Sequence, residues 1–196
     1  MQGYSVSFGQ TIGYIISASI CSTSCTDSSL ASLVVEIYCL LCTCIRKVRT
    51  ELLQLYGRNR KFYLKRKQYD GYRSEMARSL FCLCPLGWAP WSPRLVESVL
   101  LGCIPVIIAD NIRLPFPDVL RWPDISLQVA ERDVASLEVV LDHVVATNLT
   151  TMQRNLWDPV KRRALVFNCA MEEEDATWQV LKELEVKLNG LRQQVK

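Results

Sequence analysis

Two ionisable residues, Arg94 and Glu97, have the types and the spacing that could do chemistry in this chain. They follow Ser92-Pro93, a pair typical of a helix N-cap and the first helical position, so Arg94 falls in the first helical turn. The helix dipole disfavours a cation there, and such a local conflict is expected at a functional site. A guanidinium beside a helix N-terminus forms a bidentate site for a phosphate or another anion.

Glu97 lies three residues after Arg94 and therefore on the same face of the predicted helix. Its carboxylate can accept hydrogen bonds from the two hydroxyls of a ribose or of a sugar. The alternative is a structural ion pair between Arg94 and Glu97 that only ties the helix to its loop, and the spacing leaves both interpretations open. Just before the helix, Gly87 permits a tight turn and Trp88 offers a flat apolar face, so these two residues and Ser92 complete the candidate site.

The segments around this site predict the elements that position it. Leu80–Cys84 is an apolar run, Pro85–Ser92 is a loop, a segment of helical period ends at Gly102, and the apolar run Ile104–Ile108 follows. Strand, loop, helix and strand in this order predict a right-handed βαβ unit and hence an α/β fold with a parallel sheet. In such sheets ligands bind beyond the carboxyl ends of the strands, where the loop meets the helix.

The rest of the chain predicts further strands and helices around this unit. Short strands are expected at Lys61–Leu64 and Ile125–Val129, and a helix capped by Asp133 is expected to run to about Val145. A helix over Thr151–Phe167 should be interrupted near Asp158-Pro159. A terminal helix over Asp175–Leu188 should pack back over the sheet. The residues expected on its buried face are Trp178, Val180, Leu181 and Leu184.

Several classes of site are excluded by the residues that the sequence contains. The one histidine, His143, lies inside a helical pattern without a visible catalytic partner, so we expect it to have a structural or surface role. The sequence has no DxD pair, no GxGxxG and no GxxxxGK[ST], which argues against a metal-held nucleotide diphosphate and against a P-loop. A net charge of +3 does not indicate a nucleic-acid partner.

The nine cysteines do not form a recognisable framework. Cys39 and Cys42 make a CxxC, but no second pair or histidine stands at zinc-ligand spacing, so no metal site is predicted. Cys82, Cys84 and Cys103 lie in or beside predicted buried strands, where cysteine behaves as a small hydrophobic residue.

Residues 1–46 differ in composition from the rest of the chain. Their apolar run Leu30–Ile45 contains Glu36 and is short of the roughly 20 apolar residues that a membrane span needs. Basic residues follow this run instead of preceding it, which does not fit a signal peptide. An apolar anchor and a non-native leader both remain open for this segment, and a polar tail is expected at 191–196.

One long stretch carries a family resemblance. FCLCPLGWAPWSPRLVESVLLGCIPVIIADNIRLPF, with DISLQVAERDV, NLWDPVKRRALVFN and EDATWQVL after it and RKFYLKRKQYDGYRSEMARS before it, resembles the C-terminal signature of the exostosin-like glycosyltransferases of family 47. The resemblance covers about Lys47 to Leu188 and is nearest to the plant irregular-xylem or fragile-fibre type of glucuronoxylan synthesis. The xylan-backbone xylosyltransferase branch resembles the central motif as well, so this motif indicates the family better than the substrate.

The resemblance implies an inverting, metal-independent transferase of the GT-B type, with two Rossmann-like domains and the active site between them. Residues 47–190 would be its C-terminal half, which binds a UDP-sugar, with no cofactor. Arg94 would lie near the diphosphate and Glu97 near the ribose, while Gly87, Trp88 and Ser92 would line the loop over the donor. A cation and a helix N-terminus would stabilise the departing nucleoside diphosphate. The acceptor domain and the catalytic base are not among the residues that match.

We therefore expect a truncated transferase of plant glucuronoxylan synthesis that binds UDP but transfers no sugar by itself. The family also implies a polysaccharide acceptor, other xylan-synthesis glycosyltransferases as partners and a lumenal position at the Golgi membrane. Asn148-Leu149-Thr150 is an N-glycosylation sequon, which agrees with that route. Two alternatives remain: a xylosyl or arabinosyl transferase of the same family, and a non-catalytic fragment that binds nucleotide-sugar or supports a synthase complex.

Overall fold

The protein folds around a five-stranded parallel sheet, seen in a computed structural model that describes residues 33–36, 43–65, 71–86 and 93–194. The strand order is β2-β1-β3-β4-β5, and every neighbouring pair is parallel. This is one of the two common orders of doubly wound α/β sheets. The prediction of an α/β fold with a parallel sheet is confirmed. The strands are β1 (Leu33–Glu36), β2 (Phe62–Lys65), β3 (Phe81–Pro85), β4 (Ile104–Ile108) and β5 (Leu127–Val129).

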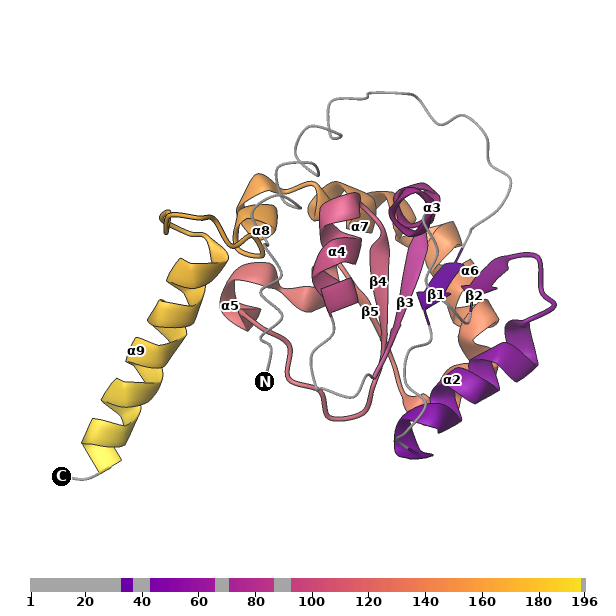
Figure 1. The fold of residues 1–196 in the computed structure, drawn as a ribbon, viewed down its shortest axis with the longest axis horizontal. Coiled ribbons are helices and arrows are strands. Elements are labelled where there is room, and N and C mark those ends of the chain that lie inside the picture. The colour runs from indigo at the N-terminus through magenta and orange to yellow at the C-terminus, as the bar shows by residue number, and fades with distance from the viewer. Residues whose placement is uncertain (1–32, 37–42, 66–70, 87–92, 195–196) are drawn as a thin grey trace, which may run out of the picture.

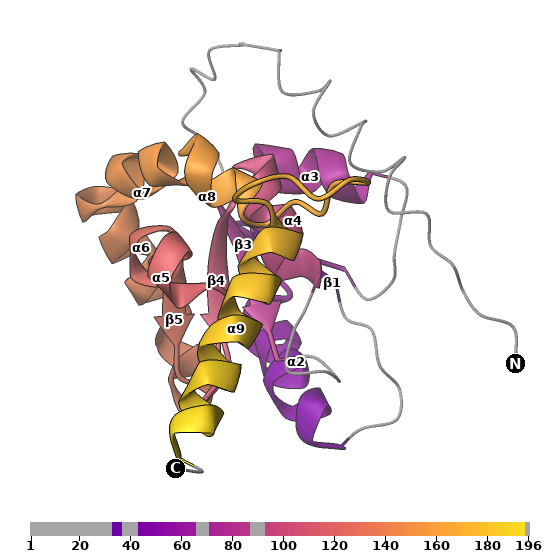
Figure 2. The same cartoon turned by 90° about the vertical axis from the view of Figure 1, so that its left-hand side faces the viewer.

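The helices cover both faces of this sheet (Figures 1 and 2). On one face α3 packs against α4, and on the other α2 packs with the 3-10 segment that leads into α6. Tyr56 of α2 donates its hydroxyl to the carbonyl oxygens of Val134 and Ala135, at 2.8 and 2.9 Å. The helices are α2 (Thr43–Tyr56), α3 (Tyr72–Arg78), α4 (Pro93–Leu101), α5 (Pro117–Leu120), η1 (Trp122–Asp124), η2 (Glu131–Ser136), α6 (Leu137–Thr147), α7 (Leu149–Leu156), α8 (Pro159–Arg163) and α9 (Ala176–Gln194).

The central βαβ unit forms as the sequence predicts, as β3, α4 and β4. Every residue of β3 and β4 is buried, because a parallel strand with helices on both faces has no solvent side. The two strands pair in register from Phe81 with Ile104 to Pro85 with Ile108. The unit therefore brings the carboxyl ends of both strands to one edge of the sheet, next to the start of α4.

Three predictions about neighbouring elements hold in outline and differ in their bounds. The strand near Ile125–Val129 is shorter, because η1 and the turn after it occupy the preceding residues. The helix expected from Asp133 begins as the 3-10 segment η2 and becomes α-helical only at Leu137. The expected interruption at Asp158-Pro159 separates α7 from α8, where the Asp158 side chain caps α8 by accepting from the backbone N–H of Val160.

The prediction that the terminal helix packs back over the sheet is wrong. In Figure 1, α9 extends away from the sheet, and it reaches Gln194, through the segment expected to be a polar tail. The residues expected on its buried face are 38–51% exposed: Trp178, Val180, Leu181 and Leu184. Helical spacing predicted the apolar face correctly, but spacing alone does not say what the face packs against. The start of α9 is held by buried Ala176 and Gln179, and farther along Oε1 of Glu183 accepts from the backbone N–H of Phe116 at 3.1 Å.

Part of the segment assigned to a leader lies in the sheet. β1 comes from the apolar run Leu30–Ile45 and pairs with β2 on one side and β3 on the other. The other residues of that run before Thr43 lie outside the described ones. Among the helices that the structure describes, none is both long and apolar enough to cross a membrane.

Candidate functional site

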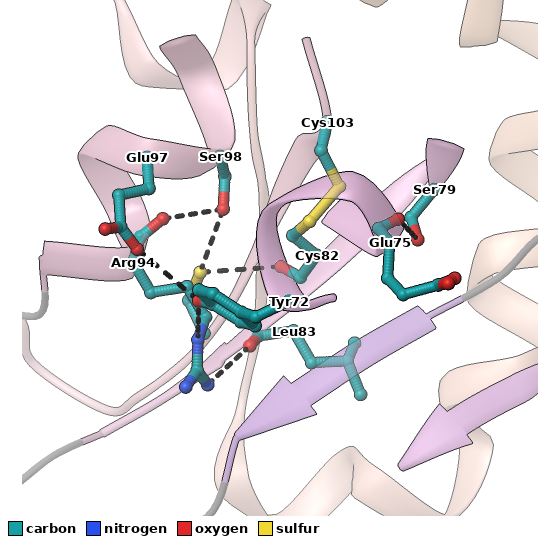
Figure 3. Close-up of a disulfide and its surroundings, with 10 residues drawn as sticks. Tyr72, Glu75, Ser79, Cys82, Leu83, Arg94, Glu97, Ser98 and Cys103 are labelled. Atoms are coloured by element: carbon teal, nitrogen blue, oxygen red, sulfur yellow. Dashed lines mark hydrogen bonds between the residues drawn. A yellow bond between two sulfur atoms is a disulfide. The ribbon is translucent and has the colours of Figure 1, made fainter. Parts of the chain in front are cut away.

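Arg94 lies in the first turn of α4, directly after Pro93, and its side chain reaches back toward the end of β3 (Figure 3). The side chain is 8% exposed. Its Nε donates to the hydroxyl oxygen of Tyr72 at 3.0 Å, and its Nη1 donates to the carbonyl oxygen of Leu83 at 3.4 Å. The guanidinium also lies over the Tyr72 ring, 5.9 Å from the ring centroid. Arg94 is therefore a fixed cation at the carboxyl edge of the sheet.

Glu97 is joined to Arg94 through Tyr72. The Tyr72 hydroxyl donates to Oε2 of Glu97 at 3.4 Å, while it accepts from Arg94, and the three side chains meet in Figure 3. Nη2 of Arg73 lies 4.0 Å from Oε1 of Glu97, whose side chain is 29% exposed. The structure therefore brings the two predicted residues together in one network, and a partly accessible carboxylate lies beside the buried cation.

Tyr72 is the residue that the sequence reasoning missed. It comes from α3, 22 positions before Arg94, in a strongly charged segment where a tyrosine has no periodic signal. The one available clue was an aromatic residue with a hydroxyl at the start of a short helix. Because a buried tyrosine hydroxyl needs a hydrogen-bond partner, that clue indicates a polar contact but not which residue supplies it.

Cys84 and Ser98 lie directly behind Arg94. The Ser98 hydroxyl donates to the carbonyl oxygen of Arg94 at 2.6 Å, and its Oγ lies 3.8 Å from the Sγ of Cys84. Burial raises the pKa of the Cys84 thiol to about 11, so the sulfur stays protonated at neutral pH. Cys84 is therefore a packing residue and not an activated nucleophile. The prediction that it behaves as a small hydrophobic residue agrees with this environment.

Cys82 and Cys103 form a disulfide, which corrects the prediction that both are small hydrophobic residues. Their Cα atoms are 5.8 Å apart across β3 and the start of β4. Cys82 lies in β3 and Cys103 directly precedes β4, so the pairing of these two strands brings the cysteines together, a relationship that only the strand order reveals. The disulfide packs with Tyr72 and Met76 of α3 in a small core of its own. The disulfide therefore lies against the helix that carries Tyr72 and supports it (Figure 3).

The C-terminal end of α4 is held as firmly as its start. Arg162 donates to the carbonyl oxygens of Val99 and Leu100 at 3.2 and 2.8 Å, and its guanidinium lies 4.5 Å from the centroid of the Trp157 ring. A cation at the last carbonyls of a helix is favoured by the helix dipole. Gly102 then ends the helix with φ +78°, beneath the Trp157 ring. Both ends of α4 are thus fixed relative to the sheet.

The remaining predicted site residues are placed as follows. Gly87, Trp88 and Ser92 lie outside the described residues, so their roles stay predictions. His143 is exposed on α6, in agreement with a structural or surface role. Within the described ranges, no group of three or more His, Cys, Asp or Glu side chains could hold a metal ion.

The family model of the exostosin GT47 domain matches residues 45–144, slightly more than half of the chain. The chain belongs to the exostosin GT47 family. The matched range of this GT47 domain contains α3, β3, α4 and β4, and with them Tyr72, Arg94 and Glu97. The recognition made from the sequence is confirmed.

The curated relatives of this GT47 chain are plant glycosyltransferases by name. It is 85% identical over 144 residues to a probable glucuronosyltransferase of Oryza sativa subsp. japonica, covering 74% of this chain and 34% of the relative. It is 67% identical over 144 residues to a probable glucuronoxylan glucuronosyltransferase of Arabidopsis thaliana, covering 74% and 32%. A probable beta-1,4-xylosyltransferase of Arabidopsis thaliana is 43% identical over 143 residues, covering 73% and 35%. The chain thus spans about a third of the length of these relatives.

Proposed function

We propose that this chain is the Rossmann-like, donor-binding half of an inverting, metal-independent GT-B transferase that moves a sugar from a UDP-sugar to growing glucuronoxylan. The observation that carries the proposal is the fixed guanidinium of Arg94 in the first turn of α4, at the carboxyl edge of a parallel sheet. The names of the relatives support the substrate class, because two of them are called glucuronosyltransferases. The GT47 family supports a UDP-sugar as donor and a polysaccharide as acceptor.

The chemistry follows from the residues of α4 and α3. When the glycosidic bond to the donor breaks, negative charge develops on the departing UDP. The Arg94 guanidinium and the backbone N–H groups at the start of α4 would stabilise that charge, and they are already in place before the reaction. Glu97 would accept hydrogen bonds from the 2′- and 3′-hydroxyls of the ribose and so orient the nucleotide. Tyr72 would hold both side chains in the geometry that this requires.

A lumenal Golgi location belongs to the same proposal. The Cys82–Cys103 disulfide supports it, because disulfides persist in oxidising compartments and are rare in the cytosol. The Asn148 sequon supports it as well, since Asn148 is exposed at the junction of α6 and α7, where an oligosaccharide has room. Cooperation with other xylan-synthesis glycosyltransferases is part of the proposal too.

Calorimetric titration with UDP tests the donor site. Arg94→Ala should weaken UDP binding by about tenfold to a hundredfold, because hydrogen bonds to charged groups contribute about 1.5–3 kcal/mol. Since Arg94 is buried, Arg94→Lys with a matching circular dichroism spectrum separates loss of the site from loss of the fold. Arg154→Ala, an exposed cation on α7, is the control. Unchanged affinity in folded Arg94 variants would refute the proposed site.

Glu97 has a sharper test, with 2′-deoxy-UDP beside UDP. The wild-type chain should prefer UDP by about tenfold to a hundredfold, because one lost hydrogen bond to a carboxylate costs about 1.5–3 kcal/mol. Glu97→Ala should bind both nucleotides equally. A preference that survives the substitution would restore the interpretation of Glu97 as a structural residue.

A xylosyl transferase is the second candidate, favoured by the 43% identity to a probable beta-1,4-xylosyltransferase. Competition between UDP-glucuronic acid and UDP-xylose for the same site distinguishes the two donors.

A further inference from the structure

A polar cavity lies where β4 and β5 end, beside the site of Arg94. Its volume is about 520 Å³, within the range of ligand pockets in proteins. The lining residues are Ala109, Asp110, Asn111, Gln128, Ala130 and Arg132. Five of the six follow one of the two strands, and Gln128 lies within β5, where it pairs with Ile107 of β4. The loop after β4 and the loop after β5 thus form the walls of one cavity.

The backbone of this cavity has an unusual conformation. Asn111 has φ +57°, in the left-handed region that only a few per cent of non-glycine residues adopt. Such conformations cluster where surrounding structure positions a ligand-binding loop. Next to it, Oδ1 of Asp110 accepts from the backbone N–H of Glu131 at 3.2 Å, which ties the loop after β4 to the loop after β5. A carboxylate has acceptor sites on both oxygens, so this tie orients Asp110 without using its full capacity.

The cavity continues a line of groups along the carboxyl edge of the sheet. Glu97 and Tyr72 lie at the contact of α4 with α3, and α3 packs toward β1. Arg94 lies at the end of β3, and the cavity lies at the ends of β4 and β5. Leu86 joins the two parts, since its backbone N–H donates to the carbonyl oxygen of Ile108 at 3.0 Å. The order is therefore carboxylate, cation and polar cavity.

A nucleotide-sugar has its parts in the matching order of ribose, diphosphate and sugar. We propose that this cavity binds the sugar that is transferred, with Asp110 accepting from its ring hydroxyls and Arg132 pairing with the carboxylate of a uronic acid. The inference rests on the proposed function and deepens it, because it assigns the choice of donor to residues that the nucleotide itself does not touch.

Arg132 has the freedom that this role requires. Its side chain is 87% exposed, and its ion pair with Asp133 is long, with Nε and Oδ2 3.8 Å apart. Exposed pairs of this kind contribute little, so the guanidinium can turn to a ligand carboxylate at small cost. A guanidinium binds a carboxylate in a bidentate way that also fixes its orientation. Asp110 on the opposite wall would repel the carboxylate of the uronic acid. The sugar therefore turns its ring hydroxyls toward Asp110 and its carboxylate toward Arg132.

Titrations of the full chain with three ligands test this subsite: UDP, UDP-xylose and UDP-glucuronic acid. UDP lacks the sugar, and UDP-xylose lacks the carboxylate. Asp110→Asn keeps an oxygen that can accept from Glu131 N–H, so the loop should keep its tie. Arg132→Ala removes the cation. The matched controls are Asp118→Asn on α5 and Arg154→Ala on α7, both exposed and away from the cavity.

The expected pattern is specific to each ligand. Asp110→Asn should weaken the binding of both UDP-sugars by about fivefold to tenfold and leave the binding of UDP unchanged. Arg132→Ala should weaken the binding of UDP-glucuronic acid by about tenfold relative to the binding of UDP-xylose. The proposed subsite is wrong if both variants bind UDP-glucuronic acid as tightly as the controls do. It is also wrong if the variants lose as much affinity for UDP as for the UDP-sugars. Failure of the wild-type chain to bind UDP would instead overturn the proposed function.

Discussion

The hydroxyl of Tyr72 accepts a hydrogen bond from Nε of Arg94 at 3.0 Å and thereby joins α3 to the first turn of α4. This contact settles how a cation is held at a helix end that disfavours it. The aromatic ring, the tyrosine oxygen and the carbonyl oxygen of Leu83 all face the guanidinium and offset part of its desolvation. The arginine is therefore oriented before any anion arrives, which lowers the entropy lost on binding.

Tyr72→Phe should loosen this arrangement without removing the cation. The ring stays, so the packing of α3 should survive, but Arg94 and Glu97 lose the oxygen that joins them. Because one hydrogen bond contributes about 1 kcal/mol, we expect UDP to bind about fivefold more weakly. Calorimetric titration measures this. Trp178→Phe on α9, an aromatic residue outside this network, serves as the control, and equal affinities for UDP in the two variants would contradict the positioning role of Tyr72.

Gly102→Ala should destabilise the whole domain. Gly102 has φ +78°, and a Cβ built there would lie 2.6 Å from Cζ2 of Trp157. Left-handed backbone at a non-glycine residue costs of order 1–3 kcal/mol, and the Trp157 ring would also have to move from beneath Arg162. Guanidinium unfolding followed by fluorescence should show a loss of about 2 kcal/mol or more.

Gly190→Ala provides the contrast for that measurement, because a Cβ there meets nothing within 4 Å. Gly190 lies inside α9 near its C-terminal end, so replacing glycine with alanine should stabilise the helix by up to about 0.5–1 kcal/mol. Equal effects of the two substitutions would show that the end of α4 is not constrained as described.

The βαβ unit could be predicted from sequence because its signals are local. The apolar runs of β3 and β4, with a helical period between them, determine the elements, and the rules for parallel connections determine their arrangement. The pair Arg94 and Glu97 was predictable for the same reason, since both lie in one helical turn. Their shared partner Tyr72 was not, because the contact depends on how α3 packs on α4.

The two main errors have the same origin. The Cys82–Cys103 disulfide depends on which strands are neighbours, and cysteines 21 positions apart give no local sign of it. The exposure of α9 depends on what covers its apolar face, whereas Leu181 and Leu184 show only that the face exists. In both cases the missing information was tertiary.

Cys84 should resist alkylation in the native chain. Its pKa is raised to about 11, mainly by burial, so the reactive thiolate is scarce at pH 8.5 and the sulfur is inaccessible as well. Iodoacetamide followed by peptide mass mapping should modify exposed Cys169 and leave Cys84 unmodified, whereas both should react in denaturant. Native modification of Cys84 at the rate of Cys169 would contradict the described burial.

The same raised pKa gives a pH dependence with a definite sign. The native state holds the thiol proton more tightly than the unfolded state, in which the pKa is near 9. The stabilisation is therefore complete below pH 9 and is lost as the pH rises toward about 11. Cys84→Ala should remove this part of the alkaline loss of stability, measured as the free energy of unfolding between pH 8 and pH 11.

Removal of the disulfide should cost the domain much of its stability. Cys82 and Cys103 enclose a loop with a sequence separation of 21, and the chain-entropy model gives roughly 3 kcal/mol for a loop of that size. Cys82→Ala/Cys103→Ala should show this loss in guanidinium unfolding, and Cys169→Ala, which removes an exposed cysteine, should not. Because the disulfide packs under Tyr72, the double variant should also bind UDP more weakly while it is still folded. Stability and UDP affinity equal to those of Cys169→Ala would mean that the two sulfurs do not support α3.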